Sequence, residues 1–326
     1  MRKAYVVADF LSDENIEQIK KTAADTGFEM EFFDDVKSAS GNVSDGEVLY
    51  SGGEAAICRE MPNLKWCHTA FAGIGAYIGT GMFASGERLL SNGSGSYGRT
   101  ISEHIIMVSL MLLRNMPVYT NSAAKKEWGP IVPLRSIADS NVVIVGTGDI
   151  GSETADKFRG LGARSIIGLN RSGRVADAFD ETYSIDEFDK LFGDKDFSES
   201  VDILALCAPG TKESEGLLSK ERIALLSKRT YLVNIGRGML VDQDALIDAL
   251  NNEEIAGAAL DVMMPEPLPE DHPLWDAKNC IITPHVSGNM SLQYTVDKTV
   301  EIFCENLKRY AAGEELTNLP DIKRGY

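Results

Sequence analysis

A strand-like run that ends in closely spaced glycines is the first feature of this 326-residue sequence with a clear chemical meaning. The apolar run at residues 141–145 leads into the motif G-x-G-x-x-G at residues 146–151, and residues 152–161 have a helical pattern. In such a turn the first glycine permits the tight bend, the second lets the backbone approach a pyrophosphate, and the third lets the helix pack on the strand. The amides at the start of the helix then face the phosphates. The sequence therefore predicts a dinucleotide site that includes Gly146, Gly148, Asp149 and Ile150.

The end of the next strand indicates which dinucleotide binds. An acidic residue about 20 positions after the glycines would accept hydrogen bonds from the ribose 2'-hydroxyl. Residues 169–174 contain no acid, but they contain Arg171 and Arg174, which would attract a 2'-phosphate. We therefore expect NADP(H) to be preferred, with NAD(H) possible. The expected contacts are Asn170, Arg171, Ser172 and Arg174. The alternative is that both arginines are ordinary solvated loop residues.

Histidine is the side chain best suited to proton transfer near neutral pH, and the sequence has four. His285 follows a short strand-like run and precedes a Gly-containing break, so we expect it to point into a cleft between domains. The others have weaker claims. His104 is expected to pack inside a helix, His272 lies in a Pro-rich loop, and His68 ends a strand.

The charge balance limits the partners that this chain can attract. Its 49 acidic and 32 basic residues give a formal charge of -17, which repels polyanions, so nucleic acid and anionic membranes are poor partners. A small anionic substrate must enter against the same field. Basic residues are therefore expected to be concentrated at the site, and Arg237 and Arg171 are candidates. Neither a signal peptide nor a membrane span is apparent, which favours a soluble cytoplasmic protein. The five cysteines have no metal-ligand spacing, so no metal site is predicted.

Strand-like and helical runs alternate along the whole chain. Predicted strands cover residues 4–8, 47–50, 64–68, 142–145, 165–169, 201–207, 231–234 and 281–282. Amphipathic helical segments include residues 14–24, 152–161 and 243–250. Apolar strands that alternate with helices are typical of parallel sheets covered by helices, so we predict an α/β fold.

Two breaks suggest where the chain crosses between domains. The Gly- and Ser-rich residues 92–98 precede a capping box, with Thr100 as the predicted N-cap and Glu103 three residues later. The helix that follows is apolar nearly all round to Leu113, so we expect it to be buried. A second break at residues 286–289 precedes a long final helix. Residues 1–98 and 287–326 would then form one domain and residues 99–286 the other. Alternatively, residues 92–98 are only a flexible surface loop.

A series of later motifs gives the sequence a specific resemblance. The runs at residues 233–238, 258–262, 265–269 and 283–285 follow the glycine motif in an order that resembles the D-isomer-specific 2-hydroxyacid dehydrogenase family. The resemblance extends over nearly the whole chain, including residues 61–66 and 72–74. It implies two Rossmann-like domains with parallel sheets, in which a nucleotide-binding domain is inserted into a discontinuous flavodoxin-like substrate domain.

The resemblance also implies roles for individual residues. Arg237 would bind the substrate carboxylate and polarise the keto oxygen, while Glu266 would pair with His285 and favour its protonated form. His285 would donate the proton as hydride arrives, which makes the reaction an NAD(P)H-dependent reduction of a 2-keto acid to the D-2-hydroxy acid. The remaining implied contacts are the amides of Ala72 and Gly73 for the substrate, and Ala208, Pro209, Ile235 and Asp261 for the cofactor.

Some departures from the common family pattern bear on the substrate. Residues 69–77 lack the Asp that many members carry, and Phe71 would narrow the pocket, which favours small substrates. The chain ends without the regulatory extension of many phosphoglycerate dehydrogenases, and residues 170–172 and 323–326 are similar to the glyoxylate and hydroxypyruvate reductase branch. A homodimer is expected. Two alternatives stay open, a formate- or phosphite-type dehydrogenase and a dinucleotide-sensing, corepressor-like interaction protein.

Overall fold

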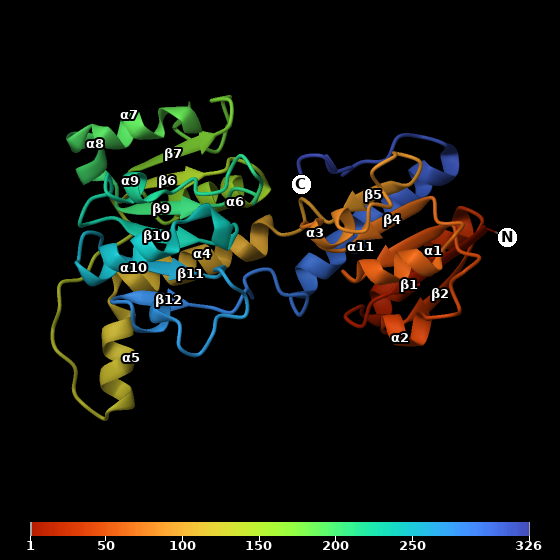
Figure 1. Ribbon diagram of the computed structural model, residues 1–326, viewed down its shortest axis with the longest axis horizontal. Coiled ribbons are helices and arrows are strands. Elements are labelled where there is room, and N and C mark those ends of the chain that lie inside the picture. The colour runs from red at the N-terminus through yellow and green to blue at the C-terminus, as the bar shows by residue number, and fades with distance from the viewer. Residues whose placement is uncertain (1, 326) are drawn as a thin grey trace. The chain divides into compact units, whose positions relative to one another are not determined.

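The computed structural model describes residues 2–325 and divides into two compact units (Figure 1). One unit combines Met1–Tyr97 with Asn289–Tyr326, and the other is the continuous segment Gly98–Gly288. Each unit contains one parallel sheet. The predicted α/β class, with two parallel sheets and a discontinuous first unit, is confirmed.

The first unit is built on a five-stranded sheet in the order β2-β1-β3-β4-β5. This is the 2-1-3-4-5 order of flavodoxin-like folds. The sequence predicted three of these strands but not the edge strands β2 and β5. The strands are β1 Arg2–Val7, β2 Phe28–Phe33, β3 Val48–Ser51, β4 Trp66–Thr69 and β5 Leu89–Asn92. The helices are α1 Asp13–Asp25, α2 Val36–Ala39, η1 Ala55–Glu60, α3 Gly75–Ile78 and α11 Gln293–Ala312.

Both faces of this sheet are covered, as the apolar strands predict. In β1, Tyr5 and Val7 belong to one core cluster, while Ala4 and Val6 belong to the cluster on the other face. The second cluster includes Phe303 and other side chains of α11, so a helix from the end of the chain completes the core formed by its beginning. This explains why the unit is discontinuous.

The second unit is built on a seven-stranded sheet in the order β12-β11-β10-β9-β6-β7-β8. The strand order reverses beside β6, so the loop after β6 lies at the topological switch point where parallel sheets bind ligands. The strands are β6 Asn141–Val145, β7 Ser165–Asn170, β8 Glu181–Ser184, β9 Ile203–Leu206, β10 Tyr231–Asn234, β11 Gly257–Leu260 and β12 Cys280–Ile282. The helices are α4 Gly98–Leu113, α5 Met116–Ala124, α6 Asp149–Gly160, η2 Ile185–Glu187, α7 Phe188–Gly193, α8 Lys195–Ser200, α9 Lys220–Ile223, η3 Gly238–Leu240, α10 Gln243–Asn251 and η4 Pro273–Asp276.

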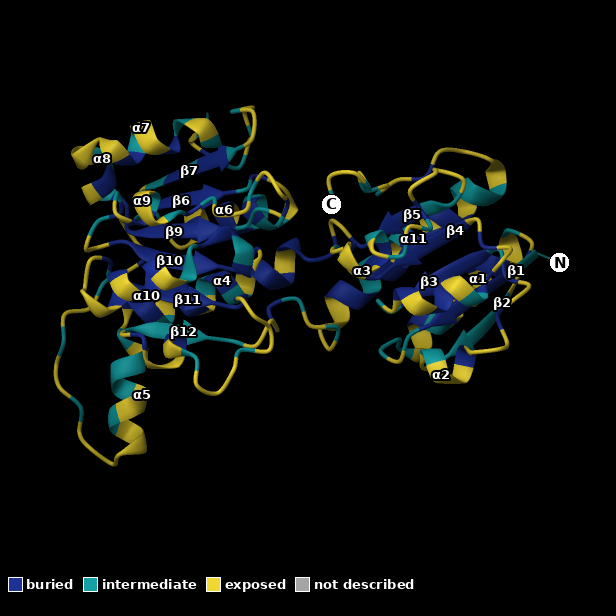
Figure 2. Ribbon diagram, viewed as in Figure 1, coloured by how far each residue is buried: buried dark blue, intermediate teal, exposed yellow. Residues whose placement is uncertain are grey.

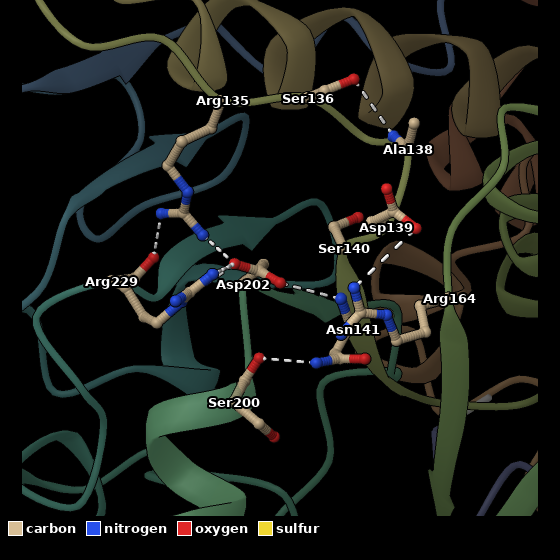
Figure 3. Close-up of a pocket in the computed structure, with 10 residues that line it drawn as sticks. All are labelled: Arg135, Ser136, Ala138, Asp139, Ser140, Asn141, Arg164, Ser200, Asp202 and Arg229. Atoms are coloured by element: carbon tan, nitrogen blue, oxygen red, sulfur yellow. Dashed lines mark hydrogen bonds and ion pairs between the residues drawn. The ribbon is translucent and has the colours of Figure 1, made fainter.

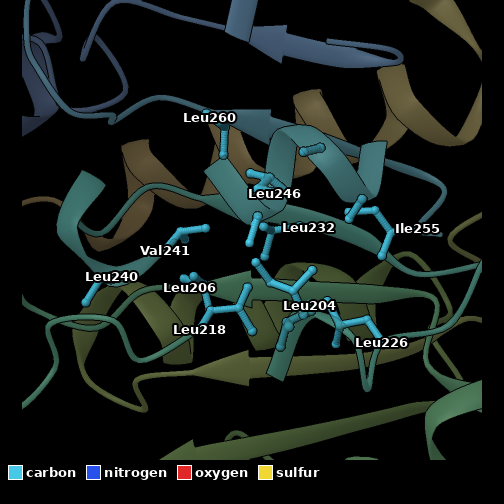
Figure 4. Close-up of a cluster of buried hydrophobic side chains, with 14 of the residues drawn as sticks. Leu204, Leu206, Leu218, Leu226, Leu232, Leu240, Val241, Leu246, Ile255 and Leu260 are labelled. Atoms are coloured by element: carbon cyan, nitrogen blue, oxygen red, sulfur yellow. The ribbon is translucent and has the colours of Figure 1, made fainter. Parts of the chain in front are cut away.

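Leucine side chains dominate the core on one face of this sheet (Figure 4). Leu204 and Leu206 of β9 and Leu232 of β10 pack against Leu246 of α10. The opposite face is covered by α4 and α6, which also contact each other. Full burial on both faces explains why these strands read as continuous apolar runs in the sequence.

The predicted start of α4 was wrong. The helix begins at Gly98, and Thr100 lies within its first turn rather than at the N-cap. The reason is a tertiary contact, because the Gly98 N–H donates to the Asp149 carboxylate at 2.7 Å. The expectation that α4 is buried all round was also wrong, since Met107 and Leu110 are 45% and 37% exposed. No helix among residues 2–325 is both long enough and apolar enough to cross a membrane.

The segment after α4 leaves apolar side chains uncovered. Helix α5 has no buried residue, and the chain from 125 to 136 extends along the outside of its unit without regular structure (Figures 1 and 2). Within this segment Trp128 and Ile131 are fully exposed. Met107 and Leu110 of α4 are exposed as well, and we call these four exposed apolar side chains the α4–α5 surface.

Candidate active site

The glycine loop after β6 has the geometry that a dinucleotide needs. Gly146 has φ 100°, and a Cβ on Gly151 would lie 1.9 Å from the Gly146 oxygen, so neither position tolerates a side chain. A Cβ on Gly148 would instead meet no atom within 4 Å, which leaves its side of the loop open for a ligand. Gly148 is the N-cap of α6, so the backbone amides of the first helical turn, which have no acceptor within the helix itself, face that space. These features fit a pyrophosphate, as predicted for residues 146–151.

Asp149 and Ile150, two of the predicted cofactor contacts, lie in the first turn of α6. The Asp149 carboxylate binds the Gly98 N–H, so what Asp149 can offer a phosphate is its backbone amide at the start of α6. Ile150 is half-buried in the same turn. The loop is therefore tied to the start of α4 through Asp149.

The loop after β7 presents both of its arginines to solvent. Asn170 organises it, since its amide nitrogen donates to Thr147 Oγ1 at 3.2 Å and to the Arg174 carbonyl at 2.8 Å. Its side-chain oxygen accepts from the N–H groups of Ser172 and Arg174. The guanidinium groups of Arg171 and Arg174 are exposed and make no hydrogen bond or ion pair within residues 2–325. Asn170 thus joins the arginine loop to the glycine loop.

Arg237 lies in a tight turn after β10 that depends on its flanking glycines. Asn234 closes this turn, accepting from the Gly236 N–H and donating to the Arg237 carbonyl. A Cβ on Gly238 would lie 2.3 Å from the backbone of Met263, so only glycine lets the two loops touch. The Arg237 side chain is exposed, and its Nη1 donates to the Gly236 carbonyl at 2.7 Å.

His285 and Glu266 are in direct contact. His285 Nδ1 lies 2.7 Å from Glu266 Oε2, and the other Glu266 oxygen accepts from the Met263 N–H at 2.9 Å. Because Gly238 packs on the backbone of Met263, the Arg237 turn and the Glu266 loop share this point of contact. The structure therefore brings the loops of all three predicted catalytic residues to the carboxyl edge of one sheet.

Asp261 is buried directly after β11, and its carboxylate faces the loop that carries His285. Its oxygens accept from Thr283 Oγ1 at 2.6 Å and from the N–H groups of Val286 and Ser287 at 3.0 Å. Burial acts to raise the pKa of Asp261, but the hydrogen bonds from Ser287, Thr283 and Val286 outweigh it and lower the pKa. The carboxylate is therefore ionised, and its hydrogen-bond acceptors are already used by donors of the same chain.

The other predicted cofactor contacts lie in the loops that follow β9 and β10. Ala208 is half-buried and Pro209 is exposed, both after β9, while Ile235 is buried after β10. The Ala208 carbonyl would lie 2.5 Å from a Cβ on Gly236, so the two loops touch. All three residues lie at the same edge of the sheet as the glycine loop, because parallel strands end together.

The predicted substrate amides belong to the first unit. Ala72 and Gly73 follow β4, and the Ala72 carbonyl accepts from Asn92 at 2.7 Å. Among residues 2–325 the N–H groups of Ala72 and Gly73 have no acceptor. Phe71 packs on Gly53, where a Cβ would lie 2.5 Å from its ring. The turn thus offers two free amide donors beside an aromatic ring.

Sequence reasoning missed the contact made by His104. It was expected only to pack inside its helix, and it is indeed half-buried, but its Nε2 lies 3.3 Å from Thr283 Oγ1. Burial lowers the pKa of His104, against the opposing effect of the Asp261 carboxylate. No local pattern could have revealed this pair, because the two residues are 179 positions apart.

A concavity of about 410 Å³ lies at the opposite edge of the second sheet (Figure 3). At its centre the buried Asp202 carboxylate binds the Arg135 and Arg229 guanidinium groups and the Asn141 N–H. These residues join the starting ends of β6, β9 and β10. Since the predicted site residues follow the other ends of the strands, this concavity is separate from the candidate site.

Most of the second unit is similar to a known protein family. Residues 106–287 match the model described as D-isomer specific 2-hydroxyacid dehydrogenase, NAD binding domain. The chain belongs to the D-isomer-specific 2-hydroxyacid dehydrogenase family. It is therefore an NAD(P)-dependent oxidoreductase, as the sequence predicted.

Individual members of the family give the same assignment. Glyoxylate/hydroxypyruvate reductase A of Photorhabdus laumondii is 30% identical over 248 residues, which cover 76% of this dehydrogenase and 75% of the relative. A family member from Aeromonas salmonicida is 26% identical, with a TM-score of 0.82 over 98% of this chain and 99% of that one. A probable 2-hydroxyacid dehydrogenase from Rhizobium etli, in complex with NADP, is 25% identical, with a TM-score of 0.76 over 100% of both chains.

Proposed function

We propose that this dehydrogenase reduces a small 2-keto acid, of the glyoxylate or hydroxypyruvate type, to the D-2-hydroxy acid. The observation that carries the proposal is the His285–Glu266 pair at 2.7 Å. The Glu266 loop contacts the Arg237 turn through Gly238 and Met263, and these loops lie at the same edge of the sheet as the glycine loop. This arrangement offers a proton donor, an anion to hold it and a cation for a carboxylate. The Photorhabdus relative, named for both substrates, supports the substrate class.

The proton is assigned to Nε2 of His285. Its Nδ1 is bonded to Glu266, whose other oxygen is fixed by the Met263 amide, so the ring cannot turn freely. Nε2 has no partner among residues 2–325, and the side chain is 47% exposed. In the proposed reaction Nε2 donates its proton to the keto oxygen as that oxygen becomes an alkoxide.

The anionic end of the substrate is assigned to the Arg237 guanidinium. The exposed Arg237 guanidinium keeps donors available, and it also stabilises negative charge on the keto oxygen during reduction. The nicotinamide cofactor, when bound, supplies the hydride.

Replacing the proton donor should abolish most turnover without affecting the cofactor. We expect His285→Ala to lower kcat by about 100-fold or more, the usual scale for loss of a general acid, and to leave NADPH affinity nearly unchanged. Arg237→Ala should lower kcat and raise KM for the keto acid. Steady-state kinetics with glyoxylate and hydroxypyruvate, and fluorescence titration with NADPH, provide the measurements.

A second histidine provides the control for this experiment. His272 caps η4 by accepting from the Leu274 N–H, and His272→Asn keeps a side chain able to do so. Its kcat should stay within about twofold of the unmodified enzyme. Unchanged kinetics in either His285→Ala or Arg237→Ala would refute the catalytic assignment.

We also propose a preference for NADP(H) over NAD(H). Arg171 and Arg174 are exposed guanidinium groups without a partner in residues 2–325, and the loop that carries them is joined to the glycine loop through Asn170. A 2'-phosphate would provide both with an anion, while an unphosphorylated ribose would not. The NADP complex of the Rhizobium relative is consistent with this assignment.

The preference predicts unequal effects on the two cofactors. Arg171→Ala should weaken NADPH binding by about tenfold, the lower end of the range for a charge-assisted contact because the site is exposed, and should change NADH binding by less than about twofold. Asn170 is left in place because it holds the loop. Arg164→Ala is the matched control, since Arg164 lies just before β7 at the opposite end of that strand. Equal losses for both cofactors, or none, would show that Arg171 is an ordinary solvated residue.

We propose that the α4–α5 surface pairs with a second copy of this chain. Trp128 and Ile131 are fully exposed, and large apolar side chains left uncovered by their own chain are typical of interaction sites. Arg114, Lys125 and Lys126 lie along the same segment, so this region is less acidic than the chain as a whole. A twofold pairing buries the same apolar side chains twice, and cyclic dimers are the commonest assemblies.

The pairing predicts a mass of twice 35.5 kDa in solution. The double variant Trp128→Ser with Ile131→Ser should shift the enzyme to monomer, because it removes the two largest exposed contacts. Leu161→Ser provides the control, since Leu161 is an exposed apolar residue of the same unit outside this surface. Light scattering coupled to gel filtration reports the mass. A monomeric parent enzyme, or a double variant that stays dimeric, would refute the assignment.

A further inference from the structure

The backbone of His285 is held in an unusual conformation. Its φ of 53° lies in the left-handed region, which a residue with a side chain rarely adopts unless its surroundings impose it. The His285 N–H donates to the carbonyl of Asp261 at 2.8 Å and to that of Thr283 at 3.0 Å. What fixes this conformation is therefore the contact between the loop and the end of β11.

The carboxylate of Asp261 supplies most of that contact. It accepts from the N–H groups of Val286 and Ser287 and from the Thr283 hydroxyl, while its own main-chain carbonyl receives the N–H of His285. One buried residue thus binds the loop on both sides of His285. No part of the Asp261 side chain is exposed, so water does not compete for these bonds.

The Thr283 hydroxyl extends the contact to helix α4. Its single proton goes to Asp261 Oδ1 at 2.6 Å, so toward His104 Nε2 at 3.3 Å the hydroxyl can only accept. The donor is therefore the Nε2–H of His104. Since α4 covers β10 and β11, His104 approaches the loop from a packed element of the same unit.

We infer that His104, Thr283 and Asp261 form a positioning network that sets the orientation of His285. These are positioning residues, because they act through the loop backbone and not on the substrate. The inference rests on the proposed function, in which His285 is the proton donor. It gives His104 a role in the reaction and makes positioning the main task of the Asp261 carboxylate.

The network predicts a specific consequence when the Thr283 hydroxyl is removed. The Nε2–H of His104 would lose its acceptor, and Asp261 would lose its shortest hydrogen bond. The loop would then relax away from the left-handed conformation at His285. A displacement of a catalytic group by about 1 Å can lower the rate by about 100-fold.

Two variants at position 283 separate the hydroxyl from the shape of the side chain. Thr283→Val keeps the volume without the hydroxyl, and we expect kcat to fall by about tenfold or more while the Kd for NADPH stays within about twofold. Thr283→Ser restores the hydroxyl and should restore kcat to within about threefold. Thr230→Val is the matched control, because it removes another buried threonine hydroxyl, at the opposite edge of the same sheet.

A readout independent of turnover reports the position of His285 directly. The chain has four histidines, so their imidazole NMR signals can be assigned by single substitutions. The His285 signal should shift or broaden in Thr283→Val and should be unchanged in Thr230→Val. His104→Gln, which can still donate to Thr283, should retain more activity than His104→Leu.

The outcomes distinguish this inference from the proposed function. If His285→Ala keeps its turnover, the proposed function fails first. If His285→Ala loses turnover but Thr283→Val keeps both kcat and the His285 signal, the positioning network is refuted and the function stands. A loss confined to NADPH affinity in Thr283→Val would also refute the network, because Asp261 would then act mainly on the cofactor. If Thr283→Val does not fold, the comparison of His104→Gln with His104→Leu gives the same decision.

Discussion

The buried carboxylate of Asp261 is the point on which the arrangement of the candidate active site depends. An ionised group inside a protein is stable only when hydrogen bonds replace its hydration. Here the replacements come from Thr283, Val286 and Ser287, and they hold the pKa of Asp261 low although burial acts to raise it. Because the donors to this one carboxylate lie on both sides of His285, the loop wraps around the carboxylate, and this conformation positions His285.

The other loops at this edge are joined by backbone contacts that only glycine permits. Gly238 lies against Met263, the Met263 amide orients Glu266, and Glu266 holds His285. In the glycine loop, Gly151 lies against the backbone of Gly146 in the same way, while the space beside Gly148 stays open. The two edges of the sheet differ in whether their arginines are already paired with a carboxylate. At the opposite edge the Asp202 carboxylate engages two guanidinium groups, those of Arg135 and Arg229, while Arg171, Arg174 and Arg237 keep donors available.

Much of this arrangement could be predicted from the sequence, where local patterns determine local structure. The glycine motif after an apolar run identified the loop after β6, and the order of the later motifs identified Arg237, Glu266 and His285 as candidates. What escaped prediction depends on contacts between distant residues. Helix α4 starts at Gly98 because the Asp149 carboxylate receives its amide, and His104 reaches Thr283 across 179 positions. The edge strands β2 and β8 were missed because they are only partly buried and contain glutamates.

This dehydrogenase is proposed to deliver a hydride to the carbonyl carbon of a small 2-keto acid. Isotope transfer tests this most directly, with NADPH carrying deuterium at both C4 positions and with glyoxylate or hydroxypyruvate as the acceptor. Mass spectrometry of the product should find a single deuterium at C2, and this product should be nearly absent with His285→Ala. Oxidation of the labelled NADPH without deuterium in the hydroxy acid, or no hydroxy acid from either substrate, would contradict the account.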